Sequence, residues 1–197
     1  MPYRIYNTKA VILKSSPHGE ADKNIIMLTE DLGLIRAQAK GVRYEKSKLN
    51  SKLQEMNLSE VGLVRGKNSW RLTSAIGIQN YFRLLRNQKS KVQVFSRVLN
   101  LILQLIHGEE KNSHLFNLIA DAGNFLIKKN LSTNEIMIFE LILVLRVLEQ
   151  LGYINQRGEL KELTNSSWGE AIAIGEKSKQ KIVAGINNAL KESHLGV

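Results

Sequence analysis

The sequence predicts an α+β chain with two domains, a five-stranded OB-fold β-barrel followed by a bundle of α-helices. The first 79 residues contain five short β-prone runs separated by turn residues, which is typical of a small closed barrel. From residue 80 onward the apolar residues recur about every 3.6 positions, the period of amphipathic helices. We therefore expect a barrel over residues 1–79 and a helical domain over residues 80–197.

Residues that favour turns bound each β-prone run. Pro17 and Gly19 follow the first run, Gly33 separates the second from the third, and Gly66 separates the last two. The expected runs cover residues 9–14, 24–29, 34–39, 55–65 and 69–78. Five strands of this length and spacing match the size of an OB-fold.

Four helices are expected in the second domain, over residues 92–106, 113–129, 132–151 and 177–193. The third begins with a capping box formed by Ser132 and Glu135 and ends at Gly152. This helix is apolar nearly all round, as expected for the centre of a bundle. Residues 153–175 are polar and contain glycine, and Leu163 and Trp168 are the side chains expected to hold this segment against the bundle.

Composition excludes several classes of protein. The chain has no cysteine, so it forms no disulfide and no thiolate zinc site, and it is compatible with a reducing cytoplasm. Its longest apolar stretches fall short of a membrane span, and no targeting segment is visible, so we expect a soluble, cytoplasmic protein. The hydrophobic content of 43% is that of an ordinary globular chain.

The positive charge is confined to the first half of the chain. Residues 1–91 carry 17 Lys and Arg against 7 Asp and Glu, whereas residues 92–197 carry 11 of each. A surplus confined to one segment indicates a surface that binds a polyanion. The densest part is residues 36–52, where six cations accompany one acid, Glu45.

The segment from Lys40 to Lys48 combines residue types that contact nucleic acid. Lys40 and Arg43 can neutralise phosphates, Gly41 lets the backbone approach closely, and Tyr44 offers a ring on which a base can stack. The alternative is a solvated charge run, but position in a loop of an OB barrel favours binding. The candidate nucleic-acid-binding residues are Lys40, Arg43, Arg36, Lys46, Lys48, Lys52, Lys14, Arg65, Lys67, Arg71 and Tyr44.

Catalytic and metal-binding patterns are absent from the sequence. The glycines form no phosphate loop or dinucleotide motif, and the four histidines do not pair at metal-ligand spacing. Glu20 and Asp22 are the nearest approach to a general acid and base, although acids in such a loop more often shape the turn. We expect no enzyme activity, no cofactor and no metal.

Several motifs occur together between residues 9 and 49. A β-prone run leads to the turn Gly19-Glu-Ala-Asp22, Leu28 and Thr29 precede a hairpin, and the loop Lys40-Gly-Val-Arg43 follows. Their order closely resembles the amino-terminal signature of the RecO family of DNA repair proteins. The resemblance is strong over residues 3–75 and weaker through the helical part.

The resemblance implies an OB-fold joined to a helical domain, in a mediator that binds single- and double-stranded DNA and anneals complementary strands. It also implies that RecR and single-stranded DNA-binding protein are partners in loading RecA. Many members of the family carry a four-cysteine zinc site, whereas residues 153–168 of this chain contain no cysteine, so zinc is not implied here. An RNA-binding OB-fold protein and a hydrolase that uses Glu20 and Asp22 remain the alternatives.

Overall fold

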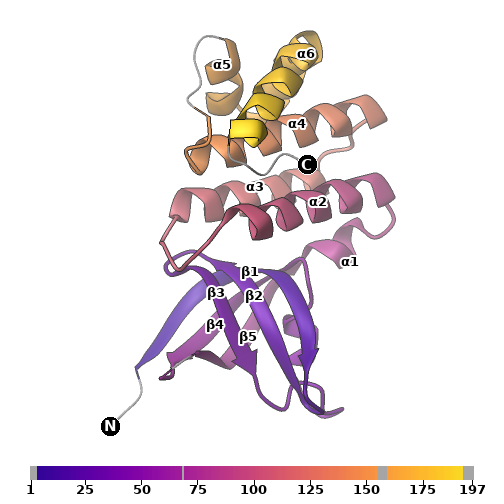
Figure 1. Cartoon of the computed structure of the whole chain (residues 1–197). Helices are drawn as coiled ribbons and strands as arrows, with labels where there is room; N and C mark the ends of the chain where they lie inside the picture. The colour runs from indigo at the N-terminus through magenta and orange to yellow at the C-terminus, as the bar shows by residue number, and fades with distance from the viewer. Residues whose placement is uncertain (1–3, 68, 155–158, 193–197) are drawn as a thin grey trace. The chain divides into compact units, whose positions relative to one another are not determined.

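A computed structural model describes residues 4–67, 69–154 and 159–192 (Figure 1). The chain forms two compact units. The first unit comprises residues 1–87 and 99–120, and the second comprises residues 88–98 and 121–197. Among the described residues, no helix is long and apolar enough to cross a membrane.

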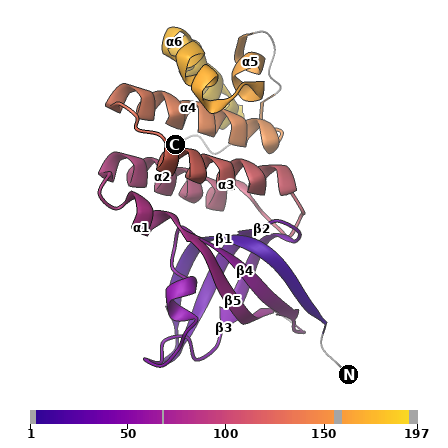
Figure 2. The same ribbon diagram turned by 180° about the vertical axis from the view of Figure 1, so that it is seen from behind.

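Five strands close into a β-barrel in the first unit (Figures 1 and 2). Their order around the barrel is β1-β2-β3-β5-β4, and β4 pairs with β1 to complete the closure. All the pairs are antiparallel except that of β3 with β5. The strands are β1 (Ile5–His18), β2 (Asp22–Thr29), β3 (Gly33–Ala39), β4 (Asn57–Arg65) and β5 (Trp70–Asn80), and a short 3-10 helix, η1 (Asn50–Lys52), precedes β4. The predicted OB-fold architecture is confirmed.

The first strand is longer than the sequence suggested. It continues through Pro17, where a turn was expected. Pro17 lies opposite Lys23 near the end of the strand, and a residue without a backbone N–H is tolerated at such a position. The first half of β1 pairs with β4 and the second half pairs with β2, with a register shift between Ile12 and Lys14. One long, irregular strand thus belongs to both sides of the barrel, which lets five strands close.

The barrel core follows from the alternation of apolar and polar residues along the strands. Side chains such as Ile12, Ile25 and Ile35 are fully buried, while Lys14, Asn24 and Arg36 are exposed. Trp70 closes one part of the core and packs edge-on against Tyr6, with 5.4 Å between the ring centroids. Trp70 is therefore a core residue rather than an exposed platform for a base.

The helices are α1 (Tyr81–Leu85), α2 (Lys89–Leu105), α3 (Ser113–Lys128), α4 (Thr133–Gln150), α5 (Glu159–Asn165) and α6 (Trp168–Glu192). Two helices of the described residues, α1 and α5, were not expected, and the expected helices begin and end close to their predicted positions with one exception. The predicted capping box of Ser132 and Glu135 is present at the start of α4. The start predicted for α6, residue 177, was wrong by nine residues. A second capping box explains the difference, because Ser167 and Glu170 exchange hydrogen bonds at this terminus.

In the second unit, an aromatic cluster and a buried arginine hold the segment that follows α4. Trp168 packs against Phe139, with 4.8 Å between the ring centroids, and Leu163 is fully buried, as expected of the two anchors. The guanidinium of Arg146 donates hydrogen bonds to the carbonyl oxygens of Leu163 and Ser166 and lies 4.2 Å from the centroid of the Trp168 ring. These bonds satisfy carbonyls at the end of α5 that have no partner within the helix.

Candidate nucleic-acid interface

A groove of about 490 Å³ lies on the outer face of the barrel, across β1, β2 and β3. Lys14 and Arg36 are its Lys and Arg residues, and other polar side chains line the rest of it. These are Ser16, His18, Asn24, Gln38 and Ser69. No carboxylate is among its lining residues. The groove therefore presents a positive, hydrogen-bonding surface to solvent.

Strand register explains why residues distant in the sequence meet in this groove. Lys14 lies opposite Ile26, and Ile26 lies opposite Arg36, so these three residues form one row across the outer face. Their neighbours Ile25 and Ala37 are buried, which confirms that the row faces outward. A cation at each end of the row flanks one half-buried aliphatic side chain.

A second, polar row lies two residues further along the strands. Ser16 pairs with Asn24, Asn24 pairs with Gln38, and Gln38 pairs with Arg71 on β5. Asn24 Nδ2 lies 3.3 Å from His18 Nδ1, so neighbouring side chains on this face contact each other. Arg71 extends the basic surface onto a fourth strand.

The loop that begins at Lys40 is built on the turn between β1 and β2. Gly41 has a φ of 63°, a left-handed conformation that favours glycine, and its N–H donates to Asp22 Oδ1 over 2.8 Å. The other carboxylate oxygen of Asp22 accepts from Gln38 Nε2, and Val42 is fully buried beneath the loop. Asp22 therefore shapes the loop, as acids in such turns commonly do.

Arg43 and Tyr44 complete the loop. The backbone N–H of Arg43 donates to the carbonyl of Ala21, and its Nη1 donates to the carbonyl of Gly19, both over 2.8 Å. The ring of Tyr44 lies against Gly41, within 3.5 Å of the place that a Cβ would occupy there, and 68% of Tyr44 is exposed. The ring is thus supported by the loop and open to solvent.

The remaining predicted nucleic-acid-binding residues lie in different environments. Lys46 and Lys48 are exposed in the same loop, and Lys67 is exposed in the turn between β4 and β5. Arg65 forms an ion pair with Glu109 over 3.3 Å and lies over the Trp70 ring. Lys52 lies across Gly77 on β5, where a different groove is found.

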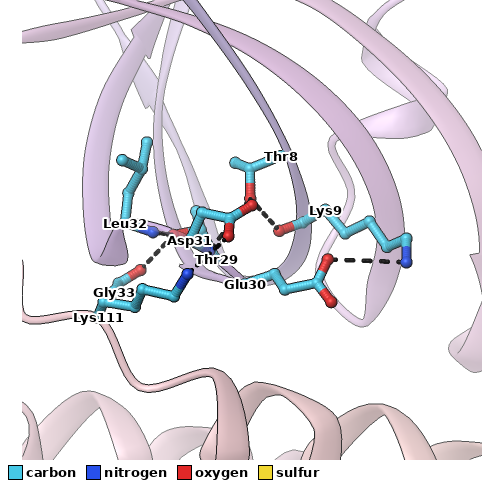
Figure 3. A network of polar contacts seen from close by, with 8 residues as sticks. All are labelled: Thr8, Lys9, Thr29, Glu30, Asp31, Leu32, Gly33 and Lys111. Carbon is cyan, nitrogen blue, oxygen red and sulfur yellow. Dashed lines mark hydrogen bonds and ion pairs between the residues drawn. The ribbon is translucent and has the colours of Figure 1, made fainter.

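Ion pairs distinguish the two ends of the barrel strands. At the hairpin between β2 and β3, Lys9 pairs with Glu30, and Lys111 pairs with Asp31 over 3.0 Å (Figure 3). The hydrogen bond from Lys111 is the main reason that the pKa of Asp31 lies below its ordinary value. Thr8 Oγ1 also donates to Asp31, so this hairpin is fixed by a local polar network.

By contrast, the cations of the groove and its loop form no ion pair within the described residues. This holds for Lys14, Arg36, Lys40, Arg43 and Arg71, all of which are exposed. We call these five residues the basic face. Carboxylate partners thus balance the cations at the hairpin. On the basic face, the positive charge has no such partner within the described residues.

Sequence reasoning missed His18, Asn24 and Gln38, the polar residues of the groove other than its Lys, Arg and Ser side chains. His18, Asn24 and Gln38 become neighbours only through strand register, which the sequence does not state. The polar residues at 14, 16 and 18 would share one face of a strand, which was the available signal, but Pro17 was interpreted as part of a turn. Among the described residues, no cluster of three or more His, Cys, Asp or Glu side chains could hold a metal ion.

Comparison with known proteins identifies relatives of this chain. Residues 1–81 match the family described as "Recombination protein O N terminal". A DNA repair protein RecO from Thermodesulfovibrio yellowstonii is 30% identical over 164 residues, which cover 80% of this chain and 64% of that protein. A DNA repair protein RecO from Dehalococcoides mccartyi is 31% identical over 160 residues, which cover 81% of this chain and 60% of that protein. The chain thus spans less than two thirds of the length of these relatives.

Proposed function

We propose that this chain, whose N-terminal domain belongs to the RecO family of DNA repair proteins, is a non-catalytic DNA-binding protein of repair and recombination. The observation that carries the proposal is the basic face, where five exposed cations form no ion pair with any residue that the structure describes. Lys and Arg without acidic partners can exchange their water and counterions for phosphate oxygens. The family resemblance makes DNA the polyanion that we propose.

The geometry of the groove suits a single strand. The distance along β1 from the row of Lys14 to that of His18 is about 13 Å, given roughly 3.3 Å per strand residue. Phosphates would contact Lys14 and Arg36 on the strands and then Lys40 and Arg43 in the loop. The exposed ring of Tyr44 offers a base a stacking surface at that end of the path.

Contacts of this kind do not read sequence. Charge neutralisation holds the phosphates in place, while base edges carry the sequence information. A strand held by its phosphates leaves many of its base edges free to pair, so we propose that the protein binds single- and double-stranded DNA and anneals complementary strands. Because annealing needs contact with any sequence, recognition through the backbone fits this role.

Glu20 and Asp22 have no catalytic role in this proposal. Both carboxylate oxygens of Asp22 already accept hydrogen bonds, one from Gly41 in the loop and the other from Gln38 on β3. A general base that shapes the backbone in this way would disturb the loop each time it took up a proton. We also propose, on the family resemblance, that RecR and single-stranded DNA-binding protein are partners and that RecA loading is the outcome.

A strand-annealing assay tests the proposal. Two complementary DNA strands are mixed with and without a coat of single-stranded DNA-binding protein, and the rate of duplex formation is measured with the wild type and with the double variant Lys14→Gln, Arg36→Gln. We expect the wild type to accelerate annealing and the variant to lose most of that effect. Preference for RNA over DNA of the same sequence in direct competition would overturn the assignment to DNA.

A further inference from the structure

Glu109, in the segment between α2 and α3, contacts the barrel with both of its carboxylate oxygens. Its Oε1 accepts a hydrogen bond of 2.9 Å from Nε1 of Trp70, and its Oε2 lies 3.3 Å from Nη1 of Arg65. All three residues belong to the first unit. Because the indole N–H of a buried tryptophan needs an acceptor, the bond from Trp70 fixes the carboxylate beside Arg65. This ion pair therefore costs less side-chain entropy than an ordinary surface pair.

The segment that carries Glu109 is itself held against the hairpin between β2 and β3. Lys111 pairs with Asp31 over 3.0 Å (Figure 3). Gly33 has a φ of 74°, and a Cβ at this position would collide with the carbonyl oxygen of Glu110. The two backbones thus approach so closely that only glycine fits at position 33. Glu109 meets Arg65 as part of an ordered contact.

Arg65 lies beside the groove of the basic face. It pairs with Trp70 across β4 and β5, and Trp70 pairs in turn with Ala37 on β3. Ala37 lines the groove, and so does Ser69, the residue before Trp70. Two strand spacings, about 10 Å, therefore separate the backbone of Arg65 from that of a residue in the groove.

The guanidinium of Arg65 is accessible to a phosphate, but its charge is already balanced. The Arg65 side chain is 64% exposed, and its guanidinium carbon lies 5.3 Å from the centroid of the Trp70 ring, which orients it. The five cations of the basic face have no carboxylate partner within the described residues, whereas Arg65 has Glu109. A phosphate can therefore bind Arg65 with its full charge only by displacing this carboxylate.

We propose that Glu109 masks Arg65 in an autoinhibitory contact, and that displacement of Glu109 adds Arg65 to the DNA-binding surface as one further phosphate contact. The inference rests on the proposed function, in which the basic face binds DNA. Glu109 thereby sets the affinity without touching any residue of the basic face. If Glu109 served only to position Trp70, removing its charge while keeping an acceptor oxygen would leave DNA binding unchanged.

The variant Glu109→Gln tests the proposal, because it removes the charge and keeps an oxygen that can accept from Trp70. Binding of a labelled single-stranded oligonucleotide is measured by fluorescence anisotropy at several salt concentrations. One additional phosphate contact should make the slope of log affinity against log salt steeper by about 0.7 and raise the affinity about fivefold at 0.1 M salt. An unchanged tryptophan fluorescence spectrum would show that Trp70 has kept its place.

Three further variants separate the mask from other effects of charge. Glu140→Gln is the matched control, because Glu140 pairs with the exposed Arg97 over 2.6 Å in the second unit, and its slope should equal that of the wild type. Arg65→Gln should leave the affinity within about twofold of the wild type, since Arg65 is masked there. Combining Arg65→Gln with Glu109→Gln should abolish the gain that Glu109→Gln produces.

Three results would contradict the proposal. An unchanged or lower affinity of Glu109→Gln would leave Glu109 with a structural role alone. A gain that survives in the double variant would show that Glu109 repels DNA directly, and an equal gain in Glu140→Gln would assign the effect to net charge. The same titrations with inorganic polyphosphate keep this test apart from the proposed function. A gain for polyphosphate in Glu109→Gln, with no variant binding DNA, would support the mask and overturn the assignment to DNA.

Discussion

Replacing Lys14 and Arg36 by Gln should change the salt dependence of DNA binding by an amount that the structure defines. Each contact with a phosphate of a single strand contributes about −0.7 to the slope of log affinity against log salt concentration. If the five cations of the basic face each contact one phosphate, the wild-type slope is about −3.5. The double variant loses two of these contacts, so its slope should be about −2.1.

The same reasoning gives the loss of affinity. If the two lines meet near 1 M salt, a difference in slope of about 1.4 corresponds to an affinity about 25-fold lower at 0.1 M salt. This is close to 2 kcal/mol of binding free energy. The free energy of unfolding should change by less than about 0.5 kcal/mol, because both side chains are exposed and neither forms an ion pair in the described part of the chain.

Fluorescence anisotropy of a labelled oligonucleotide, measured at several salt concentrations, gives both slopes. The double variant Lys161→Gln, Lys177→Gln is the control, because it removes the same net charge from exposed positions in the second unit. Its slope should equal that of the wild type. Parallel lines for the wild type and the Lys14, Arg36 variant would refute the phosphate contacts, and an equal effect of both variants would show that net charge alone is responsible.

Three further predictions concern the loop, the segment after α4 and the helix caps. Lys40→Ala with Arg43→Ala should weaken DNA binding by about 1 to 3 kcal/mol in the same titration, yet lower the free energy of unfolding by less than about 1 kcal/mol, because only the exposed bond from Arg43 to Gly19 is lost. Trp168→Ala should lower the free energy of unfolding in urea by about 2 to 3 kcal/mol, below the usual cost for a fully buried aromatic residue, since Trp168 is half-buried. Hydrogen bonds from their capping serines hold the pKa values of Glu135 and Glu170 below the ordinary 4.5. Their stabilising effect is therefore complete above pH 4.5 and lost as the pH falls through the lowered values, so circular dichroism of Glu135→Gln with Glu170→Gln should show a weaker acid transition than the wild type.

The barrel could be predicted because its strands alternate apolar and polar residues and are separated by turn residues. The extent of β1 could not, since Pro17 is a strong local turn signal and only pairing with β2 shows that it lies in a strand. The start of α6 was missed for a different reason. Ser167 and Glu170 have the spacing of a capping box in the sequence. The surrounding segment was nevertheless predicted to precede the helix, because only its polarity and its glycines were considered.

The candidate site was predictable only in part. Lys40 and Arg43 stand out as a local charge run, whereas Lys14 and Arg36 become neighbours through a register that depends on the shift at Ile12. Arg146 shows the same limit in the second unit. Nothing in the sequence indicates that this charged side chain is buried, but tertiary contacts bury it and supply carbonyl partners for its guanidinium.

Acid placement, as much as the number of cations, decides where the chain is positive. Glu30, Asp31 and Glu109 neutralise Lys9, Lys111 and Arg65, so these cations contribute little field to their surroundings. Asp22 lies beside the basic loop, but it accepts its hydrogen bonds from the neutral donors of Gly41 and Gln38 and forms no ion pair there within the described residues.

Because Asp22 lies beside the basic loop, a substitution of this acid should change DNA binding although it alters no Lys or Arg. Substituting Asp22 by Asn would take one negative charge from beside the loop, but it would also weaken the bond that holds Gly41 in its left-handed conformation. The stronger positive potential would strengthen DNA binding, whereas the loss of order in the loop would weaken it. Because ordered cations are needed for a strand to be held along the groove, the loss of order should dominate, and Asp22→Asn should weaken DNA binding despite the increase in net positive charge.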